Sequence, residues 1–172
     1  VIVGDDKQLP CVITAEDELK LNGLNSSCNI ADEYKYHAGQ SILSSLQQAL
    51  PVIPNTTLCE HYRCDPLIIG FCNQKFYDNN LVIHSQWSNN PALKVLFTVP
   101  GNHARGHFNL RQCQEIDNLV NDLVQNHHYP ADSIGLCSPF REQAERLSGH
   151  TVHKFQGREK DVIIMSTVDN QI

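Results

Sequence analysis

The sequence has no run of apolar residues long enough to cross a membrane, and it has few positive charges. A spanning helix needs about 20 apolar residues, whereas the longest apolar stretches, such as Val162–Met165, have the length of a strand. Lys and Arg number 13 against 19 Asp and Glu, giving a net charge of −6. This excludes a membrane protein and a nucleic-acid partner held mainly by bulk positive charge. A nucleic-acid partner held by a few local contacts is still compatible with the composition.

The seven cysteines show neither the spacing of a disulfide framework nor a Cys-x-x-Cys pair. The chain also opens without the basic and apolar regions of a secretory signal. The absence of a disulfide framework and of a secretory signal is typical of a reducing, intracellular setting. We expect a cytoplasmic protein, or a nuclear one if its source is eukaryotic, in which most cysteines act as small apolar side chains of the interior.

Both ends of the chain look cut. The sequence begins Val1-Ile2-Val3-Gly4 without a methionine and stops at Ile172, shortly after another apolar run. We interpret the 172 residues as a segment of a larger protein. They still suffice for a domain with a real core, since 41% of them are hydrophobic.

Short apolar runs alternate with amphipathic segments along the chain. Strands are predicted at Val1–Val3, Leu93–Val99, Ser133–Ser138 and Asp161–Val168. This alternation predicts an α/β fold with a mainly parallel sheet. Because ligands of such sheets bind at the carboxyl ends of the strands, we expect the functional residues in the adjoining loops.

Caps and apolar spacing predict the helices. Ser41–Leu50 is amphipathic, Asn109 caps the clearest amphipathic helix, and Pro139–Leu147 forms a short one. Another helix follows the N-cap Asp65, and it is expected to bury Leu67, Ile68, Phe71 and Cys72. The polar residues 14–38 are expected to be irregular.

Three polar clusters carry the candidate chemistry. In the loop Gly4–Pro10, the amide of Gln8 can donate to a phosphate oxygen and accept from a water, so it can sense a terminal phosphate. In His61-Tyr62-Arg63, the guanidinium can grip a phosphate and the tyrosine can stack on a base. The alternative for the first cluster is a solvated turn, and for the second it is a surface arginine beside a half-buried tyrosine. Each cluster, taken alone, favours its alternative.

The third cluster, Thr151–Asp161, leads directly into an apolar run and is more specific. Gly157 permits a close approach of the backbone to a ligand, and Glu159 can accept from ribose hydroxyls. Thr151, His153 and Lys154 can meet a phosphodiester backbone.

In this order, the three clusters resemble motifs III, IV and V of superfamily 1 helicases. Gly4–Pro10 resembles motif III, His61-Tyr62-Arg63 with Pro66 and Phe76-Tyr77 resembles motif IV, and Thr151–Glu159 resembles motif V. Ile134–Gln143 is similar to the strand and turn between motifs IV and V. The most similar branch contains the nonsense-mediated-decay helicase and senataxin-like proteins, and the likeness is weakest over residues 11–57 and 81–108.

The resemblance implies a role for each matching residue in binding ATP. Gln8 would contact the γ-phosphate, and Arg63 would stabilise charge during phosphoryl transfer. Tyr62 would stack on adenine, Gly157 would line the phosphates and Glu159 would bind the ribose. ATP and Mg²⁺ are the implied cofactors, with the Mg²⁺ ligands outside this chain and no metal site within it.

The resemblance also implies a track for single-stranded DNA or RNA, formed by Pro139, Phe140, Thr151, His153 and Lys154. The implied fold is RecA-like: residues 1–57 would end the first RecA-like domain and include a linker, and residues 58–172 would be most of the second. The full-length protein is expected to be a monomer. Since the sequence has no Gly-x-x-x-x-Gly-Lys-Ser/Thr loop, the isolated chain is expected not to hydrolyse ATP.

Other readings of the sequence stay open. The chain could be a helicase-like scaffold without motor activity, although such a module would not need Gln8, Arg63 and Glu159. The parent could also combine the motor with a nuclease. Cys59-x-His61-x-x-Cys64 does not match a paired zinc site. His103, His107, His127 and His128 are interpreted as solvated loop histidines, and Trp87 as an anchor of its own loop.

Overall fold

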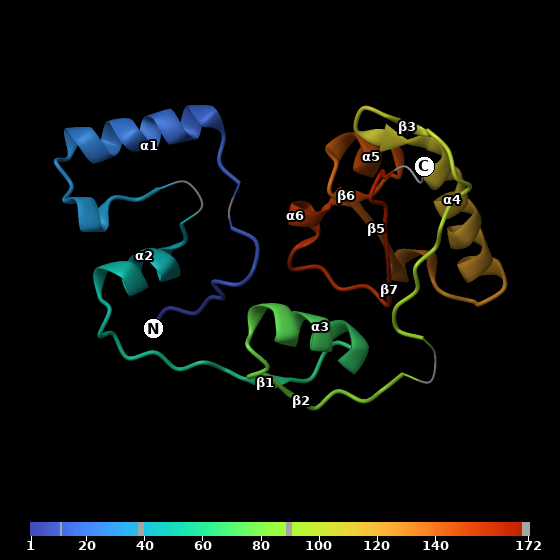
Figure 1. Cartoon of the computed structure of the whole chain (residues 1–172), viewed down its shortest axis with the longest axis horizontal. Helices are drawn as coiled ribbons and strands as arrows, with labels where there is room; N and C mark the ends of the chain where they lie inside the picture. The colour runs from blue at the N-terminus through green and yellow to red at the C-terminus, as the bar shows by residue number, and fades with distance from the viewer. Residues whose placement is uncertain (11, 38–39, 89–90, 170–172) are drawn as a thin grey trace. The chain divides into compact units, whose positions relative to one another are not determined.

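The computed structural model describes residues 1–10, 12–37, 40–88 and 91–169. The chain divides into two compact units, Val1–Lys94 and Val95–Ile172, whose elements are labelled in Figure 1. Each unit is described by itself. The predicted domain boundary after residue 57 stays a prediction. None of the helices in the described ranges is long and apolar enough to cross a membrane.

The first helix of the first unit, α1 (Ala15–Ser27), lies where an irregular segment was expected, so that prediction is wrong. Its start is fixed by a capping box, in which the Thr14 side chain accepts from the Asp17 backbone and Asp17 accepts from the Thr14 backbone. This box satisfies two donors at the helix start. The segment was misread because its helix has no apolar face, whereas the cap was visible in the sequence.

The short helices that follow are η1 (Asp32–Tyr34) and α2 (Ile42–Ala49). The prediction of α2 is confirmed, with Ser41 as its N-cap and Leu50 as its C-cap. The Ser41 hydroxyl accepts from the backbone N–H of Ser44 at 3.1 Å.

The remaining part of the first unit is a β1–α3–β2 arrangement. The strands β1 (Glu60–His61) and β2 (Val82–Ile83) pair in parallel and are joined by α3 (Pro66–Phe76). Asp65 caps α3 as predicted, since its carboxylate accepts from the backbone N–H of Leu67 at 2.9 Å. In Figure 1, α3 lies beside this pair of strands.

The prediction of which face of α3 is buried is wrong. Leu67, Ile68 and Phe71 are exposed, and the buried residues of the helix are Ile69 and Asn73. The apolar residues of α3 lie on all sides of the helix, so their spacing does not select one buried face. The Asn73 amide decides the orientation: it donates to the backbone oxygen of residue 81 at 3.1 Å and accepts from the N–H of the same residue at 2.9 Å.

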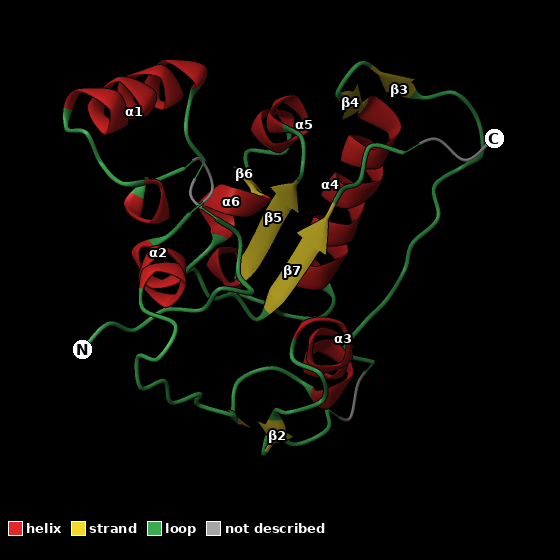
Figure 2. Ribbon diagram, turned by 60° about the vertical axis from the view of Figure 1, so that its left-hand side comes forward, coloured by secondary structure: helices red, strands yellow, loops and turns green. Residues whose placement is uncertain are grey.

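The second unit is built on a parallel sheet of three strands in the order β6–β5–β7. The strands are β5 (Ile134–Ser138), β6 (His150–Thr151) and β7 (Val162–Met165). This confirms the α/β fold with a parallel sheet. In Figure 2, β5 and β7 run side by side with helices next to them.

Helices and a hairpin complete the second unit. The helices are α4 (Leu110–Gln125), α5 (Arg141–Arg146) and α6 (Val152–Phe155), with the 3₁₀ turn η2 (Ala131–Ser133) before β5. The hairpin strands are β3 (Ala104–Arg105) and β4 (Phe108–Asn109). The core side chains of this unit come from α4, β5, α5 and the segment after β7; they are Ile116, Ile134, Cys137, Ala144, Leu147 and Val168.

Two predicted strands do not form. Val1–Val3 and Leu93–Val99 lack strand structure, and most of their apolar side chains are exposed. A strand needs a hydrogen-bonding neighbour, and among the described residues neither segment has one. The strand β7 does form, but Ile163 and Met165 on one of its faces are exposed.

The six cysteines in the described residues are free thiols, and they are expected to differ in reactivity. Cys137 is 3% exposed, and burial raises the pKa of its thiol. Cys28 is exposed. Because the thiolate is the reactive form, iodoacetamide should label Cys28 long before Cys137 in the folded chain. Timed labelling followed by mass spectrometry measures this order, and equal labelling rates without denaturant would contradict the burial of Cys137.

Candidate functional site

The loop that holds Gln8 is organised by the carboxylate of Asp5. One oxygen of Asp5 accepts from the backbone N–H of Lys7 at 3.0 Å. The other accepts from the Gln8 side-chain amide at 3.0 Å and from the hydroxyl of Tyr77 at 2.6 Å. The loop is therefore closed on itself and tied to the end of α3.

Charge and burial reinforce this arrangement. Partial burial acts to raise the pKa of Asp5, but the hydrogen bonds from Tyr77, Lys7 and Gln8 outweigh it, and the pKa lies below its usual value. Burial and the Asp5 carboxylate raise the pKa of Tyr77 to about 12. At neutral pH, an ionised acceptor therefore faces a protonated donor.

The His61-Tyr62-Arg63 cluster lies at the end of β1, just before α3. The Nε2 atom of His61 accepts from the backbone N–H of Cys64 at 2.8 Å. Burial, with a smaller effect of the Arg63 guanidinium, holds the pKa of His61 below its usual value, which keeps the lone pair available for this bond. His61 thus fixes the turn, while Tyr62 and Arg63 are exposed.

Tyr62 presents an exposed ring on a fixed support. Its ring stacks on His84 with centroids 4.8 Å apart and planes inclined by 12°. Its hydroxyl donates to Glu60 at 2.5 Å, and this bond raises the pKa of Tyr62. With 65% of the residue still exposed, the ring can accept a further stacking partner.

The zinc reading of Cys59, His61 and Cys64 receives no support from the geometry. The Nε2 atom of His61 is already used by a backbone N–H. Within the described ranges, no three His, Cys, Asp or Glu side chains are grouped so that they could hold a metal ion.

In the second unit, two predicted segments meet at the carboxyl ends of neighbouring strands. Ser138, the last residue of β5, lies opposite Thr151, the last residue of β6. Pro139 and Phe140 follow the first strand, and α6 follows the second. The structure thus brings the predicted nucleic-acid residues of both segments to one edge of the sheet, where ligands of parallel sheets bind.

The segment after β6 is arranged by a helix cap. Thr151 caps α6 by accepting from the backbone N–H of Lys154 at 3.4 Å. This cap uses Thr151 as a structural residue and leaves the side chains of His153 and Lys154 exposed.

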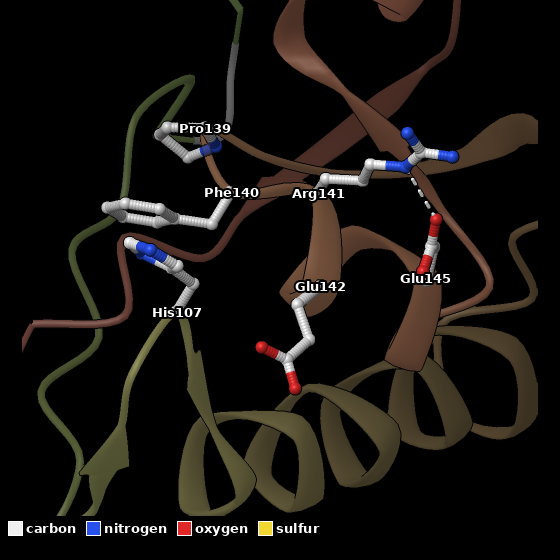
Figure 3. A pocket seen from close by; sticks show the side chains of 6 residues that line it. All are labelled: His107, Pro139, Phe140, Arg141, Glu142 and Glu145. Atoms are coloured by element: carbon white, nitrogen blue, oxygen red, sulfur yellow. Dashed lines mark hydrogen bonds and ion pairs between the residues drawn. The ribbon is translucent and has the colours of Figure 1, made fainter.

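An open hollow of about 340 Å³ adjoins the turn after β5. Its lining comes from the β3–β4 turn, the turn after β5 and the helix α5, and consists of His107, Pro139, Phe140, Arg141, Glu142 and Glu145. The His107 and Phe140 rings stack with centroids 5.2 Å apart and planes inclined by 18° (Figure 3). Arg141 donates to Glu145 at 2.8 Å. The hollow therefore combines aromatic faces with charged groups.

His107 was not predicted as a site residue, because it was interpreted as a solvated loop histidine. It reaches Phe140 from a hairpin more than 30 residues away in the sequence. No local sequence pattern predicts such a contact. The one available signal was an aromatic side chain two residues before the N-cap Asn109.

A buried polar network holds the hairpin against α5. The Gln143 side chain is fully buried; its amide donates to Ser166 at 2.8 Å and its oxygen accepts from the backbone N–H of Asn109 at 2.9 Å. Ser166 donates to Gln112 at 2.5 Å. Because Asn109 follows His107 by two residues, the network places the histidine over Phe140.

The residues predicted to contact phosphate and ribose lie on the loop between α6 and β7. Gly157 has a φ of +79°, a conformation that favours glycine. Glu159 is exposed on the same loop. The loop is anchored by the backbone N–H of Arg158, which donates to the oxygen of Phe155 at 3.0 Å. The roles of Gly157 and Glu159 stay predictions.

Comparison with known proteins gives a consistent result. The model of a family described as "AAA domain" matches residues 38–171. Helicase sen1 of Schizosaccharomyces pombe is 27% identical over 202 aligned positions, covering 98% of this chain and 11% of the relative. A probable helicase of Dictyostelium discoideum is 31% identical over 198 positions, covering 98% of this chain and 18% of the relative.

A third relative is the DNA replication ATP-dependent helicase/nuclease of Gallus gallus, 25% identical over 188 positions that cover 99% of this chain and 17% of the relative. The chain therefore spans between about a tenth and a fifth of the length of these curated relatives.

Proposed function

The chain belongs to the AAA domain family whose model it matches, and on this premise we propose that it is part of an ATP-driven superfamily 1 helicase that moves along single-stranded DNA or RNA. The observation that carries the proposal is the match to helicases along almost the whole chain. Three motif-like loops with fixed geometry support it.

We assign the nucleotide chemistry to the residues predicted from the sequence. The exposed ring of Tyr62, fixed by His84 and Glu60, fits stacking on adenine. The exposed guanidinium of Arg63 fits the oxygens of a phosphate. ATP supplies the phosphoryl group that is transferred, while Gln8 senses the terminal phosphate.

Glu159 and Gly157 complete the proposed nucleotide contacts. An exposed carboxylate can accept from both ribose hydroxyls, and the positive φ of Gly157 lets a backbone N–H approach a phosphate without a side chain in the way. No ligand of Mg²⁺ is assigned to this chain, because the resemblance to superfamily 1 helicases places those ligands outside it.

We assign the nucleic-acid track to the strand ends of the second unit. Phe140 and His107 offer a pair of stacked rings, and aromatic faces bind bases of any sequence. Pro139 lies next to them, and the exposed His153 and Lys154 follow the neighbouring strand, where they can contact phosphates. Few local contacts of this kind are compatible with a net charge of −6.

The test is ATP hydrolysis by the full-length protein that carries this segment, with and without single-stranded DNA and single-stranded RNA. Stimulation by one of them would support the motor and identify its track. Nucleic-acid binding without hydrolysis would favour the inactive scaffold. The 172-residue chain, assayed in parallel, is expected to be inactive, and turnover by it alone would overturn that prediction.

Replacing Phe140 with alanine is expected to weaken binding of a single-stranded oligonucleotide by about 5- to 150-fold, since base stacking contributes about 1–3 kcal/mol. Replacing His107 with alanine should weaken it less, because the larger Phe140 ring remains as a stacking surface. Fluorescence anisotropy with a labelled oligonucleotide measures both values. The matched control is Tyr34→Ala, which removes an exposed ring of the first unit and should leave binding unchanged. Unaltered binding by Phe140→Ala would contradict the assignment of the track.

A further inference from the structure

Tyr77 has no role in the function proposed so far, although it belongs to the sequence that resembles motif IV. It follows the last residue of α3 as the C-cap, and its backbone N–H donates to the oxygen of Asn73 at 3.1 Å. Its side chain is partly buried. The hydroxyl reaches Asp5 across 72 residues of sequence, at 2.6 Å.

Tyr77 and Gln8 meet at a single atom. Both the Tyr77 hydroxyl and the Gln8 amide donate to the Oδ2 atom of Asp5, at 2.6 and 3.0 Å. Hydrogen bonds to a carboxylate are about twice as strong as those between neutral groups. The position of the Gln8 amide is therefore set by a carboxylate that Tyr77 holds in place.

The opposite end of α3 carries Arg63. Asp65 follows Arg63 by two residues, caps the helix through Leu67, and accepts from the backbone N–H of Ser88 at 2.8 Å. A helix of 11 residues is about 16 Å long and acts as a stiff rod. Its start is thus fixed next to Arg63, and its end is fixed to the Gln8 loop.

We propose that Tyr77 is a positioning residue that, through Asp5, holds the Gln8 amide in place and couples the Gln8 loop to α3 and Arg63. This inference rests on the proposed role of Gln8 as the sensor of the terminal phosphate. The phenol acts purely as a neutral donor and touches neither ATP nor the reacting atoms.

The Tyr77→Phe variant isolates this role. Phenylalanine keeps the ring and the backbone cap of α3, so the change removes a single hydrogen-bond donor. Asp5 still accepts from Lys7 and Gln8, but it loses its link to the helix. We expect the variant to fold as the unsubstituted protein does and to misplace the Gln8 amide.

The experiment compares two nucleotides on the full-length protein: fluorescent ADP and a fluorescent, non-hydrolysable ATP analogue. Only the analogue has the phosphate that Gln8 would contact. Tyr77→Phe should lower the affinity for the ATP analogue by at least about 5-fold, the lower end of typical coupling between sites. It should leave the affinity for ADP unchanged. A merely structural defect would lower both affinities or the unfolding temperature.

A double variant and a control variant complete the test. If Tyr77 acts through Gln8, then Tyr77→Phe should cause no further loss of analogue binding once Gln8→Ala is present, because the two effects share one path. Tyr34→Phe removes a hydroxyl from another exposed tyrosine of the same unit and should change neither affinity. Additive losses in the double variant would overturn the inference.

The outcomes separate this inference from the function on which it rests. If Gln8→Ala weakens the analogue and Tyr77→Phe does not, the sensor stands and the positioning role of Tyr77 is wrong. If Gln8→Ala leaves the preference for the analogue intact, the proposed sensor itself is wrong, and the inference falls with it.

Discussion

Replacing Arg63 with alanine should lower the rate of ATP hydrolysis by the full-length protein by about 1,000-fold. An arginine that stabilises the charge of the transferred phosphoryl group contributes a factor of about 10³–10⁵. Arg63 is exposed at the end of β1, and the His61 bond to Cys64 fixes the turn around it. The large effect follows because no solvent molecule can supply an equally placed positive charge.

Steady-state kinetics with saturating ATP and nucleic acid measure this effect. Arg63→Lys should recover a small part of the rate, since an ammonium group keeps the charge and loses the bidentate geometry. Arg111→Ala is the matched control, because Arg111 pairs with Glu115 on α4 and has no proposed role. A rate for Arg63→Ala within about threefold of the parent would exclude a catalytic role, since the expected factor is far larger.

Replacing Gln143 with alanine should lower the free energy of unfolding of the second unit by about 3 kcal/mol. The side chain is fully buried and bonds to Asn109 and Ser166. Its loss leaves the N–H of Asn109 without this acceptor and opens a cavity. A buried donor without a partner costs about 1–3 kcal/mol, and the cavity adds to this cost.

The adjacent Glu142→Ala variant is the control. Glu142 is exposed and accepts from Arg146 at 3.3 Å, a surface ion pair worth about 0–1 kcal/mol. Urea unfolding followed by circular dichroism gives both values, and hydrogen exchange over β5 and α5 reports on the second unit directly. Equal stabilities of the Gln143 and Glu142 variants would contradict the buried network.

The two predictions address different levels of the molecule. Arg63 acts at a ligand, so its loss should change the rate far more than the stability. Gln143 acts inside the protein and sets the hairpin that carries His107, so its loss should weaken both folding and oligonucleotide binding. Measuring rate, binding and stability for both variants therefore separates chemistry from architecture.

Helix starts could be read from the sequence because caps are local. Asp65, Asn109 and Ser41 each bind a backbone N–H within three residues, so the pattern and the structure involve the same few positions. The helix α1 was missed for lack of an apolar face, although its Thr14 cap follows the same rule.

The strands and buried faces were harder to predict, because they depend on distant partners. Val1–Val3 and Leu93–Val99 have strand-like composition, yet an apolar run forms a strand only beside another one. In α3, the helix's own apolar residues lie on all of its sides. The polar Asn73 selects the buried side through its hydrogen bonds to residue 81.

The sequence by itself determined the family, the parallel α/β fold and the order of the motif-like loops, and the comparisons confirm the family. These features depend on residue types at short, fixed spacings. Only the tertiary structure decided that His107 stacks on Phe140 and that Tyr77 binds Asp5. Such contacts join residues far apart in the chain, and they exist because the fold closes the distance, so no local pattern contains them.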